Sequence, residues 1–242
     1  MDLKTETAQS PVRERGPAEV PGSPRRKLWG ALTIASLLLL LAMAFFYAPE
    51  DANQGAAQRI FYIHVPSAWI GFLAFFVVFV GSIAFLSTGK RSWDDVAAAS
   101  AEIGVIFTSA VLITGPLWGR PVWGVYWTWD PRLTSFLMLW LIYLSYLVLR
   151  GYVPEPVRRA KYAAVLGIVG FLDVPIVYLS ARWWRSEHPT QFVVESGDLP
   201  TQMLVTLLVG VAAFTFLYLY LMAVRVRVGR LRTRIEEAEV VR

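Results

Sequence analysis

Residues 115–149 read GPLWGRPVWGVYWTWDPRLTSFLMLWLIYLSYLVL, and this stretch joins an aromatic segment to a long apolar run. The run at 134–149 has no charged residue, which is typical of a helix that crosses a lipid bilayer. The segment before it, 115–134, contains four Trp and one Tyr spaced by Gly and Pro. Aromatic faces lose little side-chain entropy on binding, so this segment predicts an apolar ligand platform beside a membrane helix.

The rest of the chain has the composition of a membrane protein. It is 56% hydrophobic and 17% charged, which excludes a soluble globular domain of 242 residues. A helix of about 20 apolar residues crosses the hydrocarbon core of roughly 30 Å. Segments of this kind lie at 28–47, 68–86, 96–114, 134–149, 162–179 and 199–224. The expected fold class is an all-α polytopic membrane protein, with six transmembrane helices forming one membrane domain at 28–225.

The two ends of the chain differ from this domain. Residues 1–27 are rich in Pro, Gly, Glu and Arg and are expected to be a disordered cytoplasmic tail. The apolar run behind them is of spanning length, which favours a retained anchor over a cleaved signal peptide. Residues 226–242 are expected to form a basic cytoplasmic tail.

The basic residues predict the orientation. With both termini in the cytoplasm, 18 of the 23 Lys and Arg residues lie on the inner side. The segment 115–134, between the third and fourth helices, is then on the outer side. The arginines at 225–234 follow a spanning helix and alternate with Val and Leu, so lipid headgroups rather than nucleic acid are their expected partners.

Several chemistries are excluded. The chain has no Cys, which rules out disulfides, thiolate metal sites and a CxxCH attachment motif. It has no phosphate-binding loop, so ATP binding is not expected. It has no Ser–His–Asp pattern or His-rich metalloprotease motif, so hydrolase activity is not expected either. A cofactor would have to be held by His, carboxylate, Met or packing.

The Trp and His residues gather on the outer side. Seven of the ten Trp are there: Trp69, Trp118, Trp123, Trp127, Trp129, Trp183 and Trp184. An aromatic belt alone would populate both interfaces. The only two His, His64 and His188, lie in the outer loops that flank the Trp-rich segment. Two neutral imidazoles on either side of an aromatic slot are typical of a six-coordinate haem; the alternative is that both His only hydrogen-bond to water or headgroups.

Outer arginines fit the same hypothesis, because guanidinium pairs with carboxylates such as haem propionates. Arg120 and Arg132 border the platform, and Arg182 and Arg185 lie beside His188. Arg182 is equally well explained as a residue that flanks a helix end. If the fifth helix continued one turn, Trp184 and His188 would share a face. The predicted lining of a non-covalent, b-type haem site is Trp118, Trp123, Tyr126, Trp127, Trp129, Asp130, Arg132, Arg120 and Trp184, with His64 and His188 as metal ligands.

Three acidic residues have structural alternatives. Asp130 precedes Pro131 and is expected to cap the fourth helix rather than to donate a proton. Glu102 and Asp173 fall inside spanning segments, where carboxylates are costly. Each indicates either a proton or substrate path or a hydrogen bond to a neighbouring helix, and neither receives a role in the haem site.

Three stretches carry a resemblance to a known family: WGRPVWGVYWTWDPRLTS at 118–135, YIHVP at 62–66, and PIVY at 175–178 leading to Trp183, Trp184 and His188. With these motifs the chain resembles the haem-handling membrane proteins with a tryptophan-rich segment (the WWD domain). Within them it is most similar to CcmC, the haem exporter protein C family of cytochrome c maturation. Tyr126 stands where a further Trp is common in that family, a conservative change that should keep the platform.

The resemblance implies a multi-pass protein of the bacterial inner membrane that binds haem at its periplasmic face. His64 and His188 would be the axial ligands, and the haem would pass to the periplasmic chaperone CcmE. The implied partners are the ABC transporter subunits CcmA and CcmB, whose ATP hydrolysis would release the loaded chaperone, and the small protein CcmD.

Four functions remain open from the residues. A haem-binding and transfer protein without enzymatic activity is preferred. A permease would need a path through the bundle, for which Glu102, Asp173 and Pro175 are the only indications. A ligase-like enzyme would actively promote haem attachment to its acceptor. A structural subunit would use its aromatic residues to contact another protein and would bind no cofactor.

Overall fold

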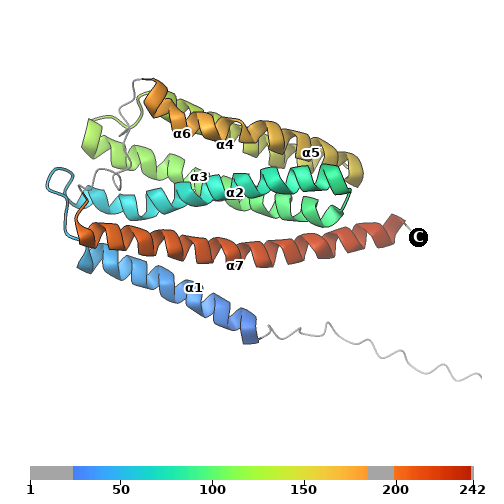
Figure 1. The fold of residues 1–242 in the computed structure, drawn as a ribbon, viewed down its shortest axis with the longest axis horizontal. Helices are drawn as coiled ribbons and strands as arrows, with labels where there is room; N and C mark the ends of the chain where they lie inside the picture. Colours follow the sequence, from blue (N-terminus) through green and yellow to red (C-terminus); the bar gives the residue numbers. More distant parts are fainter. Residues whose placement is uncertain (1–23, 185–198, 241–242) are drawn as a thin grey trace, which may run out of the picture.

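The computed structural model describes residues 24–184 and 199–240 and shows a bundle of long helices (Figure 1). Six of its helical segments are long and apolar enough to cross a membrane, which confirms the predicted fold class. The elements are α1 (Pro24–Ala42), a π-helical turn (Met43–Tyr47), a 3-10 turn (Ala56–Ile60), α2 (Phe61–Thr88), α3 (Arg91–Trp123), α4 (Pro131–Tyr152), α5 (Pro156–Phe171), α6 (Asp173–Trp183) and α7 (Thr201–Val240).

The helices are arranged around α2 and α3. α7 lies between α1 and the α2–α3 pair, and α4, α5 and α6 cover the other side of that pair (Figure 1). α2 and α3 approach closely because Gly104 faces Phe75: a Cβ on Gly104 would lie 2.5 Å from the Phe75 ring. Phe75 in turn stacks on Tyr143 of α4, with ring centroids 3.6 Å apart. Small residues at helix crossings are the usual device for close packing in membranes.

Helix boundaries differ from the sequence prediction in several places. α2 begins at Phe61 rather than at 68, so His64 lies inside this helix and not in the predicted outer loop before it. α3 continues to Trp123, so the first half of the Trp-rich segment is helical although it contains Pro116 and Pro121. The fifth span consists of α5 and α6, which meet at Leu172. α7 runs on to Val240, well beyond the predicted membrane boundary.

Candidate functional site

His64 is part of a short chain of hydrogen bonds. It lies near the start of α2 with 8% of its surface exposed, and its Nδ1 is 2.9 Å from Thr114 Oγ1 of α3. The Thr114 hydroxyl donates its one proton to the carbonyl oxygen of Ala110 at 2.7 Å. With its proton used in this way, the Thr114 oxygen is left to accept a hydrogen bond from His64 Nδ1–H. A neutral imidazole protonated on Nδ1 has its lone pair on Nε2, which is the form that binds a metal ion.

Trp118 packs against the imidazole one turn after Thr114. The two ring centroids are 5.7 Å apart in an edge-to-face arrangement, and Phe61 contacts the same indole at 5.8 Å. The Trp118 Nε1–H donates to Gln54 Oε1 at 2.8 Å. Gly115 also faces the ring, because a Cβ there would lie 3.4 Å from His64 Cε1. α3 thus supplies the wall that orients His64.

The end of α3 carries the next two predicted residues. Gly124 is left-handed, with φ 78°, and its N–H donates to the carbonyl oxygen of Arg120 at 3.0 Å. Arg120 Nη1 donates to the Gly124 carbonyl at 2.6 Å, and its guanidinium lies 5.7 Å from the centre of the Tyr126 ring. Trp123 rests on Gly119, where a Cβ would be 2.9 Å from the indole. Arg120 therefore helps to close the helix end beside the aromatic segment.

Trp127 and Trp129 form a second aromatic pair beyond that helix end. Their ring centroids are 5.6 Å apart at an interplanar angle of 78°, so they meet edge to face rather than as a flat stack. Trp129 has φ 54° and is 70% exposed. A bulky side chain rarely adopts this left-handed backbone, and such residues cluster at functional sites. Trp127 Nε1 is buried and has no hydrogen-bond partner among the described residues.

Asp130 caps α4, as expected from the sequence. Its Oδ1 accepts hydrogen bonds from the backbone N–H groups of Arg132 at 2.9 Å and Leu133 at 3.1 Å. Its Oδ2 accepts from Thr128 Oγ1 at 3.0 Å. Pro131 occupies the first turn, where its missing N–H costs nothing. The cap fixes where the aromatic segment joins α4.

We expect Asp130→Ala to destabilise the protein by about 1 kcal/mol, because it removes the cap of α4. Asp130→Asn keeps an oxygen acceptor and should cost only a fraction of that. Thermal unfolding of both variants in detergent would measure the difference. Equal losses for Ala and Asn would show that the negative charge, rather than the cap, is what matters.

The remaining predicted residues lie around residue 184. Trp183 and Trp184 contact each other edge to face at 5.8 Å. α6 ends at Trp183, and Trp184 has an extended backbone. The further helical turn that would place Trp184 on the same face as a later residue is therefore not formed from Trp184. His188 and Arg185 lie outside the described residues, and the side chain of Arg182 is not described either. Arg132 is partly buried at the start of α4.

The two acidic residues inside spans lie in different surroundings. Glu102 forms an ion pair with Arg225 of α7, in the half of α3 away from His64. Asp173 begins α6 at the break after α5, and its Oδ2 is buried without a hydrogen-bond partner in the part of the chain described.

Sequence reasoning did not identify Thr114 or Gln54. Thr114 could have been found by continuing the third helix through the Trp-rich segment, which places it four residues before Trp118 on the same face. Nothing in the sequence distinguishes Gln54.

Comparison with known proteins gives the family. Residues 23–241 match the family model described as heme exporter protein C. The chain is 42% identical over 186 residues to heme exporter protein C of Bradyrhizobium diazoefficiens, which covers 75% of this chain and 71% of that protein. It is 34% identical over 191 residues to a ccmC-like mitochondrial protein of Marchantia polymorpha (77% and 81% covered) and 36% identical over 164 residues to heme exporter protein C of Escherichia coli (65% of each). The chain therefore belongs to the heme exporter protein C (CcmC) family of multi-pass membrane proteins, which handle haem for cytochrome c maturation.

Proposed function

We propose that this protein binds haem as its cargo at the periplasmic face of the bacterial inner membrane and delivers it to the haem chaperone CcmE. The observation that carries the proposal is the contact between His64 Nδ1 and Thr114 Oγ1, which favours the tautomer that has its lone pair on Nε2. His64 and His188 are the proposed axial ligands. Without Cys, the haem is held non-covalently as a b-type haem.

The Trp-rich segment has groups suited to the propionates and the porphyrin ring of the haem. Trp127 Nε1 and Thr134 Oγ1 are buried polar atoms without a hydrogen-bond partner among the described residues. Together with the guanidinium groups of Arg120 and Arg132, they are donors suited to propionate carboxylates. Tyr126 and Trp129 are 59% and 70% exposed and offer apolar area for the porphyrin.

Delivery requires no covalent chemistry from this chain. It presents the haem edge to CcmE, while the transporter subunits CcmA and CcmB and the small protein CcmD complete the assembly. In this proposal the protein is not an enzyme, and any help with attachment to the chaperone consists of orientation.

A permease is the second candidate. It is favoured by the buried, unpartnered carboxylate oxygen of Asp173 at the break between α5 and α6, since broken helices with midplane polar groups are typical of transporters. Asp173→Asn should abolish haem movement into sealed vesicles if this function holds. Binding and delivery alone predict no such loss.

The test of the main proposal is an absorption spectrum of the purified protein with added haem, oxidised and reduced. We expect a bis-imidazole spectrum that disappears in the His64→Ala/His188→Ala double variant. A wild-type protein that takes up no haem would contradict the proposal and favour a structural, partner-contacting role.

Thr114→Val should weaken haem binding about tenfold, because loss of a partner that orients a metal-binding His typically has an effect of this size. Thr114→Ser keeps the hydroxyl and should retain wild-type affinity. The haem reduction potential distinguishes positioning from simple destabilisation, since it should shift in the Val variant and return in the Ser variant. An unchanged potential in both would show that Thr114 has no influence on the ligand.

A further inference from the structure

The last part of α7 carries an apolar stripe. It consists of Val224, Val228, Leu231 and Ile235, which are four, three and four residues apart and therefore share one face of the helix. Their exposure rises along the helix, from 36% at Val224 to 61% at Ile235. Figure 1 shows this end of α7 (red) projecting well past the start of α1 (blue). The described part of the chain thus leaves the stripe largely uncovered.

The packing of α1 on α7 shows where the stripe lies relative to the bilayer. The two helices run in opposite directions, and a Cβ on Gly210 of α7 would lie 3.2 Å from Leu40 of α1. Ten residues away on each helix, a Cβ on Gly30 would lie 3.5 Å from Tyr220. The same spacing places the exposed Lys27 of α1 level with residue 223 of α7. The stripe therefore begins where the charged end of α1 begins.

Most of the stripe lies beyond the lipid. An exposed Lys at the end of a spanning helix marks the edge of the hydrocarbon core. Measured along α7 from the level of Lys27, Leu231 is about 12 Å and Ile235 about 18 Å further on. The headgroup layer on each side of the core is only about 5–7 Å thick. Leu231 and Ile235 are therefore exposed to water, unlike the apolar residues on the bilayer-facing sides of the other helices.

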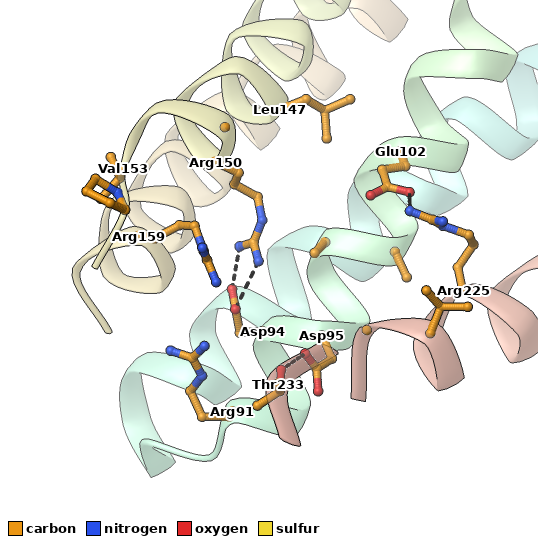
Figure 2. Close-up of a pocket in the computed structure, with 16 residues that line it drawn as sticks. Arg91, Asp94, Asp95, Glu102, Leu147, Arg150, Val153, Arg159, Arg225 and Thr233 are labelled. Atoms are coloured by element: carbon orange, nitrogen blue, oxygen red, sulfur yellow. Dashed lines mark hydrogen bonds and ion pairs between the residues drawn. The ribbon is translucent and has the colours of Figure 1, made fainter. Parts of the chain in front are cut away.

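Contacts with α3 hold this part of α7 along the axis of the bundle. Arg225 pairs with Glu102, and Thr233 Oγ1 donates to Asp95 Oδ1 at 3.0 Å (Figure 2). Between them, a Cβ on Gly229 would lie 3.6 Å from Asp95. These three α7 residues are four apart and form the face toward α3, whereas the stripe lies on the opposite side of the helix. α7 thus points away from the membrane, and its stripe cannot lie flat on the bilayer surface.

Arginines flank the stripe on both sides. The stripe has the spacing of the a and d positions of a heptad, in which Arg225 and Arg232 occupy e positions and Arg227 and Arg234 occupy g positions. Residues 224–235 contain no Asp or Glu. Side chains at e and g decide which helix can pair with an apolar seam. This face therefore suits a helix with acidic residues beside its own apolar seam.

Two other occupants suit the stripe less well. Two copies of the chain in one membrane have the same orientation, so their α7 helices would pair in parallel and bring the arginines at e and g against each other. Residues 1–23 carry four acidic and three basic residues, with Pro at 11, 17 and 21. A nearly balanced charge and repeated Pro do not suit a helix that complements a row of arginines.

We infer that the stripe of Val224, Val228, Leu231 and Ile235 is a docking site for an amphipathic helix of a partner protein. The apolar face of that helix packs on the stripe, and its flanking Glu or Asp side chains pair with the arginines. The site lies at the end of the bundle away from His64. A partner can therefore be held there without covering the proposed haem site, and the inference does not depend on haem binding.

The test measures binding of a labelled helical peptide to the purified full chain in non-ionic detergent by fluorescence anisotropy. The probe peptide has Leu at a and d and Glu at e and g, and the control peptide has Lys at e and g. The stripe variant is Leu231→Gln/Ile235→Gln, at exposed positions where folding should be unaffected. Its matched control is Tyr152→Gln/Val157→Gln, which changes exposed apolar residues at the same end of the bundle.

We expect the Glu peptide to bind at least about tenfold more tightly than the Lys peptide. The stripe variant should bind the Glu peptide about tenfold more weakly or worse, because two apolar contacts are lost, and the control variant should bind it like wild type. Equal binding of the two peptides would overturn the proposal. So would equal losses in the two variants, since they would indicate adsorption to any apolar surface.

A single Cys distinguishes the other occupants, because the chain has no Cys of its own. Leu231→Cys, labelled with a polarity-sensitive dye, should show water-like emission in phosphatidylcholine and phosphatidylglycerol vesicles and a blue shift on addition of the Glu peptide. A blue shift without peptide in phosphatidylglycerol alone would show that the bilayer covers the stripe. One that is lost on removal of residues 2–22 would show the N-terminal segment there, and one that depends on protein concentration would show a second copy. Each of these three results would overturn the proposal.

Discussion

The His64→Ala variant should bind haem at least about 100-fold more weakly than wild type. Loss of a residue that only orients a metal ligand lowers affinity about 10- to 100-fold, and this substitution removes the ligand itself. The variant also leaves a space between Phe61, Thr114 and Trp118 that is the size of an imidazole ring. Imidazole in solution should enter that space and restore much of the affinity and the spectrum. Haem titration followed by absorption, with and without imidazole, measures both effects.

Gln54→Leu is the matched control for His64→Ala. It removes the acceptor of the Trp118 indole N–H but leaves the imidazole and its Thr114 bond in place. Its haem spectrum should remain that of wild type, with at most a small loss of affinity. A His64→Ala protein with wild-type spectrum and affinity would show that another group ligates the iron.

The six spans followed from the sequence because the bilayer imposes one requirement, a long apolar helix, at every crossing. The position at which the third helix ends could not be predicted from the sequence, because this part of the helix contains Pro116 and Pro121. In a soluble protein such residues usually end a helix, and the sequence prediction places 115–134 between the third and fourth spans. In a membrane bundle neighbouring helices tolerate Pro, and α3 continues to Trp123.

The candidate site was predictable where the signal is local. Asp130 is followed at once by Pro131, and its role as a cap depends only on nearby backbone N–H groups. The partner of His64 is 50 residues away in the sequence, and no local pattern links the two. The prediction of a flat aromatic platform remains a prediction for the haem-bound form; here Trp127 and Trp129 meet edge to face, which their ring quadrupoles favour.

The charged side chains that meet at the other end of the bundle could not be found from the sequence for the same reason (Figure 2). Arg150 and Asp94 are 56 residues apart, and Arg225 and Glu102 are 123 apart. Basic residues are common at the cytoplasmic ends of spanning helices. This rule explains on which side of the membrane they lie, but it does not indicate that their side chains come together. Only the packing of α3 against α4 and α7 brings these charges together.

Arg150→Met should destabilise the protein by about 3–5 kcal/mol, because it leaves the carboxylate of Asp94 buried without its partner. The Asp94 and Arg150 side chains are only 5% and 16% exposed, so water would replace the lost hydrogen bonds only in part. Asp94→Leu/Arg150→Met removes both charges and should recover most of the loss, since a buried pair is often replaceable by apolar residues. Unfolding of the single and double variants in detergent would measure this coupling.

Arg158→Met provides the comparison for a pair exposed to solvent. Arg158 Nε lies 3.9 Å from Glu155 Oε2, and the two side chains are 65% and 49% exposed. Loss of this pair should change the free energy of unfolding by about 0–1 kcal/mol. A large effect of Arg150→Met beside a small effect of Arg158→Met would assign the cost to burial rather than to charge. If the double variant were as unstable as Arg150→Met alone, the Arg150 stem would matter through packing between α3 and α4.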